Sequence, residues 1–195
     1  MATYTKRYGE ALALAVRAHE GQVRKGTAIP YIYHPVAVSA LVIEHGGDED
    51  QAIAGLLHDV LEDCDPQYGA EIREAFGPRI YSRVADLTDG ATDRDARGRI
   101  SWQDRKDAYL AHLRHVPDAV ILVSACDKLH NALAIANDYA DIGEAVFERF
   151  SQPKVKTAWY YRSLSRTFDD RLGAHHGLPS RLRTAIEVWT KAGVS

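Results

Sequence analysis

Apolar residues recur at intervals of three and four along most of the chain, which is the spacing of one face of an α-helix. The apolar stripes of the first three predicted helices are Tyr8, Leu12, Ala15 and Val16; Val38, Leu41 and Val42; and Ile53, Leu56, Leu57, Val60 and Leu61. Pro35 suits the first turn of the second helix, and Gly46-Gly47 ends it. Asp48 and Gln51 have the spacing of a capping box, which predicts that the third helix begins there.

The helical spacing continues in the second half of the chain. Gly77-Pro78 interrupts one helical stretch, and Ser101 precedes a new helix. Pro117 opens the longest apolar stretch, to about Asn137, whose length and alanine content favour a helix over a strand. The last two stripes are Ala158, Tyr161, Phe168 and Leu172, and then Leu182, Ala185, Ile186 and Trp189. The pattern predicts an all-α fold, an irregular helical bundle in a single domain.

The segment from Thr88 to Arg99 is polar and has no helical or strand period. We predict a mobile loop there. A plain solvated connector has the same composition, so both interpretations stay open, as does closure of this loop over a ligand.

Composition narrows the class of protein and its partners. The chain has 195 residues, of which 46% are hydrophobic and 26% charged, and its net charge is -3. This charge gives no reason to expect nucleic acid or anionic lipid as a partner. No apolar stretch approaches the roughly 20 residues of a membrane span, and the N-terminus has no signal-peptide core. Two cysteines make no disulfide framework, so we expect a reduced, cytoplasmic protein of unknown oligomeric state.

Ionisable residues interrupt two of the most apolar stretches. His58 and Asp59 lie within the run 54–63, Asp127 lies within the run 120–131, and His34 precedes Pro35. An ionisable group in a core is costly unless it is paired or binds a metal. Two imidazoles and two carboxylates are a plausible ligand set for one divalent cation, with Mn²⁺, Fe²⁺ and Zn²⁺ all compatible. Each residue alone has another interpretation: a hydrogen-bonded core histidine, a partner of Lys128, or a helix cap.

Two further polar groups are close to these residues in sequence. Glu62 and Asp63 follow one helical turn after His58 and Asp59, which places them to hold or deprotonate a water molecule. The alternative is an exposed acidic helix end, which the helix dipole disfavours. Arg24, Lys25 and Gly26 form a turn suited to phosphate, although basic turns are also common without a ligand.

The chain resembles the HD-domain phosphohydrolases in its pattern of His34, His58-Asp59 and a distant Asp127. The surrounding segments are similar to the hydrolase domain of the RelA/SpoT family: 18–27, 30–35, 56–63 and 127–131. The similarity runs from about residue 8 to about residue 161. We therefore expect residues 1–195 to form one HD-type hydrolase domain whose C-terminal helices extend to residue 192. The chain is too short for the synthetase and regulatory domains of the family, which implies a stand-alone small alarmone hydrolase.

The resemblance implies hydrolysis of the 3′-pyrophosphate of guanosine tetra- or pentaphosphate to GDP or GTP and pyrophosphate, usually with Mn²⁺. The metal ligands that it implies are His34, His58, Asp59 and Asp127. The acidic pair that it implies for orienting and activating water is Glu62 and Asp63. The substrate contacts that it implies are Arg24, Lys25, Lys128 and Asn131.

Three other functions remain compatible with the sequence. One is an HD-type phosphatase acting on another nucleotide, such as NADPH or an adenosine alarmone. Another is an inactive nucleotide-binding sensor, which would not need the Glu62-Asp63 pair. The third is a structural helical module, which leaves the buried acidic residues unexplained.

Overall fold

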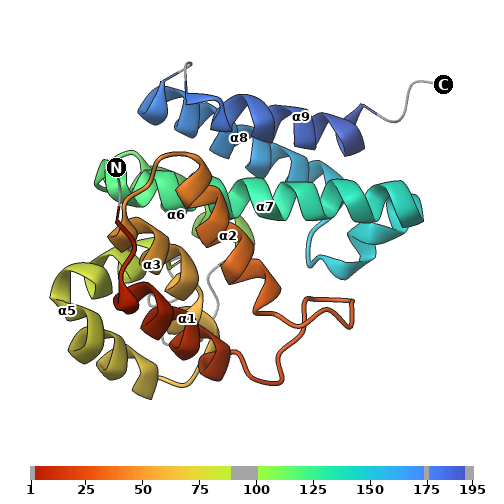
Figure 1. The fold of residues 1–195 in the computed structure, drawn as a ribbon. Helices are drawn as coiled ribbons and strands as arrows, with labels where there is room; N and C mark the ends of the chain where they lie inside the picture. Colours follow the sequence, from red (N-terminus) through yellow and green to blue (C-terminus); the bar gives the residue numbers. More distant parts are fainter. Residues whose placement is uncertain (1–2, 89–100, 174–175, 192–195) are drawn as a thin grey trace. The chain divides into compact units, whose positions relative to one another are not determined.

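The described residues of the computed structural model, 3–88, 101–173 and 176–191, fold almost entirely into helices (Figure 1). The elements are α1 (Lys6–Ala18), α2 (Tyr33–Glu44), α3 (Glu49–Leu57), α4 (Val60–Asp63), α5 (Gln67–Leu87), α6 (Trp102–Leu113), α7 (Asp118–Ile142), the 3₁₀ helix η1 (Gly143–Arg149), α8 (Lys154–Leu172) and α9 (Leu178–Thr190). These residues contain no strand, only an isolated bridge between Val23 and Pro30. The all-α prediction is confirmed.

The chain forms two compact units, Met1–Ser124 and Ala125–Ser195. The boundary between them falls within α7. The single domain expected for residues 1–195 stays a prediction. The loop expected between Thr88 and Arg99 lies, after Thr88, outside the described residues.

Several predicted helix ends are confirmed by side-chain caps. The Asp48 carboxylate accepts a hydrogen bond from the Gln51 amide (2.8 Å), and the Gln51 side chain accepts one from the Asp48 amide (2.9 Å). Ser101 caps α6 by accepting from the backbone of Asp104. Gly77, with φ 83° and ψ 170°, kinks α5 at the predicted interruption. Local side-chain chemistry therefore accounts for where these helices begin and bend.

The third predicted helix is wrong in one respect, because it does not continue through residue 61. It ends at Leu57, a turn at His58 and Asp59 follows, and α4 begins at Val60. Asp59 has φ -94° and ψ -5°, in the bridge region, where the regular hydrogen-bond ladder of a helix is interrupted. Leu61, predicted in the buried stripe, is only half-buried.

The first three helices are held close together by small and polar groups. A Cβ atom on Gly55 of α3 would lie 3.2 Å from the Cα atom of Ser39 on α2. The Ser39 hydroxyl donates to the Ala52 carbonyl (2.9 Å) and lies 2.9 Å from the Tyr8 hydroxyl of α1. The approach of α2 to α3 therefore depends on a missing side chain and on one buried hydroxyl.

A buried carboxylate joins α3 to α1 and α5. Asp50 is 7% exposed and accepts a hydrogen bond from Arg7 (3.1 Å) and another from Arg79. A third guanidinium, that of Arg83, lies 3.9 Å away. Because a buried charge is costly without partners, this cluster stabilises the position of α3 within the first unit.

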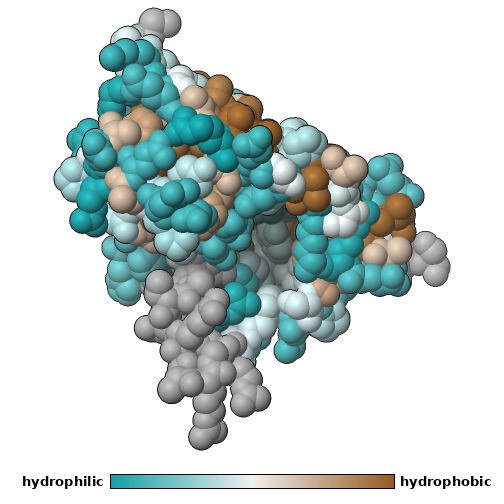
Figure 2. Space-filling model, turned by 90° about the horizontal axis from the view of Figure 1, so that it is seen from below, coloured by the Kyte–Doolittle hydropathy of each residue, from teal (hydrophilic) through white to brown (hydrophobic). Residues whose placement is uncertain are grey.

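The segment Asp118–Arg149 is, within the described ranges, the only one long and apolar enough by composition to cross a membrane. Its most apolar 18-residue stretch has a mean hydropathy of 1.4 and is 72% buried in the fold, as expected for a core helix. In the second unit α8 and α9 lie side by side (Figure 1). On the face shown in Figure 2, hydrophilic residues predominate and apolar patches lie between them.

Replacing Gly55 by alanine is expected to lower the free energy of unfolding by about 1 kcal/mol. The added methyl group improves helix propensity by about 1 kcal/mol. It also presses on the backbone of Ser39, and overpacking of this kind costs about 1–3 kcal/mol. Urea denaturation followed by circular dichroism measures the net effect.

Gly9→Ala is the matched control, because Gly9 lies within α1 and a Cβ atom there would meet nothing within 4 Å. This variant is expected to gain up to about 1 kcal/mol. An equal gain in both variants would show that α2 and α3 tolerate the extra methyl group.

Candidate metal centre

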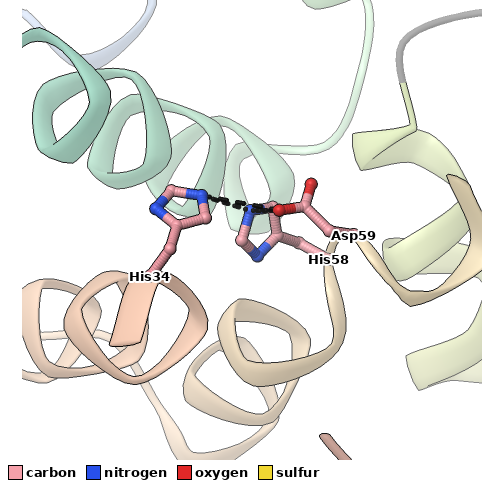
Figure 3. A group of neighbouring side chains, drawn as sticks. All are labelled: His34, His58 and Asp59. Carbon is pink, nitrogen blue, oxygen red and sulfur yellow. Dashed lines mark hydrogen bonds and ion pairs between the residues drawn. The ribbon is translucent and has the colours of Figure 1, made fainter. Parts of the chain in front are cut away.

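Three of the predicted metal ligands converge in the first unit (Figure 3). His34 projects from the first turn of α2, and His58 and Asp59 from the turn between α3 and α4. The Nε2 atoms of the two histidines are 3.1 Å apart. The Asp59 Oδ2 atom lies 3.0 Å from Nε2 of His58 and 3.5 Å from Nε2 of His34. The three ligand atoms therefore form a small triangle.

This triangle fits one divalent cation. Ligand atoms about 2.0–2.2 Å from a shared ion are about 2.8–3.6 Å from one another at octahedral or tetrahedral angles. All three observed separations fall in that range. Two imidazole nitrogens and one carboxylate oxygen suit first-row transition metals. The cluster is able to bind a divalent metal.

A backbone hydrogen bond fixes which nitrogen of His58 faces the cluster. The Nδ1 atom lies 2.9 Å from the Gly55 carbonyl oxygen, which can only accept, so Nδ1 carries the proton. In the neutral ring the Nε2 lone pair then points toward Nε2 of His34. Metal-binding histidines usually have such an outer partner, which sets the tautomer and the ring orientation.

Burial of the cluster is uneven. The side chains of His34 and His58 are 1% and 3% exposed, whereas that of Asp59 is 18% exposed. The two histidines therefore lie on the side of the cluster that is buried in the protein, and Asp59 lies on the side that solvent reaches. A site of three protein ligands with one accessible side has room for water or a substrate, as catalytic centres require.

Tyr31 is a site residue that the sequence reasoning did not assign. Its hydroxyl donates to Asp59 Oδ2 (2.7 Å) and lies 3.4 Å from Oδ2 of Asp63. It therefore links a ligand carboxylate to one member of the acidic pair. Tyr31 precedes the first residue of α2, so no helical spacing in the sequence linked it to His34.

A second set of contacts holds Tyr31 against α4. The rings of His19 and Tyr31 have centroids 4.8 Å apart. The Gln22 side chain contacts His19 Nδ1 through its oxygen (2.7 Å) and donates through its nitrogen to the Asp63 carbonyl (3.0 Å). These contacts position the tyrosine hydroxyl between the two carboxylates.

The predicted acidic pair lies at the exposed end of α4. Glu62 and Asp63 are both exposed, and their amides bond to the Asp59 carbonyl at 3.2 and 2.9 Å. Desolvation raises the pKa of the Asp63 carboxyl, and the neighbouring Asp59 raises that pKa further, while His19 and the Tyr31 hydrogen bond lower it. A carboxylate with a raised pKa is a stronger hydrogen-bond and proton acceptor, which suits a residue that holds a water molecule.

The predicted phosphate contacts lie on a short, closed turn. The Arg24 amide donates to the Ile29 carbonyl (2.8 Å), the Tyr31 amide donates to the Gln22 carbonyl (2.9 Å), and Gly26 has φ 73°. The Arg24 guanidinium lies 5.7 Å from the Tyr31 ring centroid, and Lys25 is exposed. The Arg24 side chain therefore lies over the ring of Tyr31, whose hydroxyl contacts Asp59.

The other predicted site residues, Asp127, Lys128 and Asn131, belong to the second unit. Asp127 is 5% exposed. Its two carboxylate oxygens accept from Lys128 Nζ and from Asn131 Nδ2, each at 2.6 Å. The ion pair with Lys128, one of the alternatives that the sequence left open, is thus present. Metal binding by Asp127 stays a prediction.

The two cysteines do not add a ligand to this cluster. Burial raises the pKa of the Cys64 thiol to about 11, and the charge of Asp63 contributes to the same shift. Cys64 Sγ lies 3.4 Å from His19 Nδ1, and Cys126 is fully buried. At neutral pH Cys64 is a protonated thiol, which is neither a nucleophile nor a good metal ligand.

The chain is similar to one domain family and to proteins named for the hydrolysis or synthesis of ppGpp. The HD domain family matches residues 11–152. The guanosine-3′,5′-bis(diphosphate) 3′-pyrophosphohydrolase MESH1 of Xenopus tropicalis is 34% identical over 157 residues, which cover 79% of each chain. The bifunctional (p)ppGpp synthase/hydrolase SpoT of Escherichia coli is 32% identical over 177 residues, 88% of this chain. The chain spans 22% of the length of that relative.

Solved structures show the same fold. A metazoan orthologue of SpoT, described as hydrolysing ppGpp, superposes with a TM-score of 0.75 at 22% identity, over the full length of both chains. A protein of Listeria monocytogenes superposes with a TM-score of 0.65 at 24% identity, over 79% of this chain and 96% of that one. At these identities the likeness establishes the helical architecture.

Replacing His58 by alanine is expected to weaken Mn²⁺ binding by more than about 100-fold, because loss of an outer partner alone costs about 10–100-fold. Isothermal titration calorimetry on the wild type should give one strong site. His115→Ala is the control, since His115 is an exposed histidine at the end of α6. Unchanged affinity in the His58 variant would exclude this cluster as the metal site.

Tyr31→Phe is expected to lower the affinity for Mn²⁺ by about tenfold, because Asp59 loses the hydroxyl that orients it. The same titration measures the change. Tyr33→Phe, at an exposed tyrosine two residues away, should bind like the wild type. Equal affinities in all three proteins would mean that the Tyr31 hydroxyl has no part in metal binding.

Proposed function

The chain belongs to the HD domain family, and from this premise we propose that it hydrolyses the 3′-pyrophosphate of guanosine tetra- or pentaphosphate. The products are GDP or GTP and pyrophosphate. The observation that carries the proposal is the triangle of His34, His58 and Asp59, next to the Glu62-Asp63 pair. Relatives named for this reaction cover most of the chain and support the choice of substrate.

The proposed cofactor is one Mn²⁺ ion, and Fe²⁺ or Zn²⁺ would also suit the donor atoms. His34, His58 and Asp59 would hold it. Asp127 is proposed as the fourth ligand on the sequence pattern alone. When bound, such a cation supplies a Lewis acid that polarises the phosphate and lowers the pKa of water.

The residues of the chain manage protons and charge around the reacting phosphate. Water attacks the phosphorus atom attached to the 3′ oxygen, the bond between that phosphorus and the 3′ oxygen breaks, and the 3′ oxygen takes up a proton from solvent. Glu62 accepts the proton of the water, and Asp63 orients that water. Arg24 and Lys25 offset the negative charge that develops on the phosphate.

Lys128 and Asn131 are proposed to contact the phosphate and the ribose or base. In the structure the Asn131 amide nitrogen donates to Asp127 (2.6 Å), which fixes the position of the amide beside that carboxylate. The second candidate is hydrolysis of another nucleotide, such as an adenosine alarmone or NADPH, for which the same metal cluster and acidic pair would serve. A binding sensor without turnover is disfavoured, because it would not need Glu62 and Asp63 beside the cluster.

The setting that we propose for this activity is the cytoplasm, with a nucleotide as the small-molecule partner. Neither nucleic acid nor a membrane is proposed as a partner. The oligomeric state is left open by the described contacts.

The decisive experiment measures pyrophosphate release from guanosine tetraphosphate by the purified chain, with and without Mn²⁺. Release should require the cation. Glu62→Gln should lower kcat by about 100-fold or more, because general base catalysis contributes about 10²–10⁴-fold. Glu74→Gln is the control at an exposed glutamate of α5, and it should leave kcat unchanged.

The same assay separates the candidate substrates. Adenosine 3′-pyrophosphates and NADPH are tested beside the guanosine substrate at equal concentration. A larger kcat/KM for either of these two than for the guanosine substrate would identify that nucleotide as the preferred substrate. Binding without turnover at full Mn²⁺ occupancy would replace the hydrolase with a sensor.

The pH profile tests whether ionisation of Asp63, the water-orienting member of the acidic pair, controls the rate. Because the Tyr31 hydrogen bond lowers the pKa of Asp63, Tyr31→Phe should raise that pKa. Less of the carboxyl is then ionised at a given pH, so the acidic limb of kcat/KM should move to higher pH. Tyr33→Phe provides the reference profile. An unmoved limb at saturating Mn²⁺ would remove Asp63 from the ionisations that control the rate.

A further inference from the structure

A groove of about 250 Å³ lies between α8 and α9 in the second unit. Four basic side chains and two carboxylates line it: Arg162, Arg166, Arg183, Lys191, Asp169 and Glu187. Two of the basic residues are neutralised locally. Arg183 pairs with Asp169, and Lys191 pairs with Glu187 (2.6 Å). Both carboxylates of the groove are thus in ion pairs with basic residues of the same groove.

Arg162 and Arg166 are the cations that remain. Both are exposed, and they lie four residues apart on α8, so they share a face of the helix. Among the described residues neither has a side-chain ion pair or hydrogen bond. Two like charges at this spacing destabilise a helix. An anion bound between them would offset this cost.

The groove also has a buried apolar residue in its lining. Ile186 of α9 is 2% exposed and lines it. Pockets for drug-sized ligands are about 300–1,000 Å³, so this groove is small even for a nucleoside. Guanidinium groups bind phosphate through two parallel hydrogen bonds, and two of them match the charge of one phosphate dianion.

We propose that the α8–α9 groove is a binding site for a small phosphate anion, inorganic phosphate or pyrophosphate, held by Arg162 and Arg166. The site is separate from the proposed hydrolysis, because none of its residues belongs to the metal cluster or the acidic pair. Arg183 and Lys191 border the ligand and stay paired with their carboxylates. Binding weakens with salt, because both arginines are exposed.

The test uses the full chain, freed of metal with a chelator so that phosphate has no cation to bind. Isothermal titration calorimetry at low ionic strength compares phosphate with pyrophosphate, and the ¹H–¹⁵N spectrum locates the ligand. One equivalent should bind and shift the amides of residues 162–169 and 183–191. The double variant R162Q/R166Q should bind at least about tenfold more weakly, since charged hydrogen bonds are lost.

The matched control is K156Q/R181Q, which removes the same charge from exposed positions on the same two helices outside the groove. It should keep wild-type affinity, and circular dichroism should show all proteins equally folded. Wild-type affinity in R162Q/R166Q would overturn the proposal. An equal loss in both double variants would do so too, because binding would then follow net charge alone. Either result leaves the proposed hydrolysis untouched, because that activity is measured separately as pyrophosphate release from guanosine tetraphosphate.

Discussion

The close approach of α2 to α3 is the constraint on which the metal centre depends. Gly55 has no side chain, so its helix approaches the backbone of Ser39, and its carbonyl oxygen accepts a hydrogen bond from the Nδ1–H group of His58. One residue therefore sets both the spacing of the helices and the tautomer of a ligand. His34 lies in the first turn of α2 and His58 directly follows the last residue of α3, and their nitrogens lie 3.1 Å apart because these two helices are close. A wider helix pair would separate the ligands beyond the reach of one ion.

The turn after Leu57 determines where the metal ligand Asp59 and the acidic pair lie relative to His58. Were the helix regular through this point, Asp59 would follow His58 around the helix at about 100°. The observed backbone of Asp59 brings its carboxylate to 3.0 Å from the His58 nitrogen and leaves it partly exposed. The Asp59 carbonyl oxygen also accepts hydrogen bonds from the backbone amides of Glu62 and Asp63. The ligand Asp59 and the acidic pair are thereby connected by backbone hydrogen bonds. The Tyr31 hydroxyl makes a second connection, between the side chains of Asp59 and Asp63.

Much of the fold follows from local signals in the sequence. The capping box at Asp48, the serine cap at Ser101 and the Gly77 kink each depend on neighbours within a few residues, and each was predictable. The break before α4 was not, because His58 and Asp59 are compatible with a helix by propensity, and tertiary contacts decide their conformation. The 3₁₀ helix at Gly143–Arg149 was also missed, since no apolar period identifies it.

The site was predictable in its residue types and less so in its connections. Unexplained polar residues in apolar stretches pointed to His58 and Asp59, and the structure places His34 beside them. Tyr31 was missed because a tyrosine near a proline has many roles, and only the folded turn brings its hydroxyl to two carboxylates from α4 and the turn before it. Contacts between residues this far apart in the sequence produce no periodic pattern, so the sequence alone does not reveal them.

The turn that carries Arg24 and Lys25 has a consequence for how such a protein can diverge. Its shape is maintained by backbone hydrogen bonds from the amides of Arg24 and Tyr31, and by the Thr27 hydroxyl, which donates to the Arg24 carbonyl (3.0 Å). Neither basic side chain is needed to close it. Mutation at these two positions can therefore alter which anionic ligands are attracted, while the backbone that presents Tyr31 and His34 is preserved. Selection on ligand preference is in this way uncoupled from selection on the metal centre.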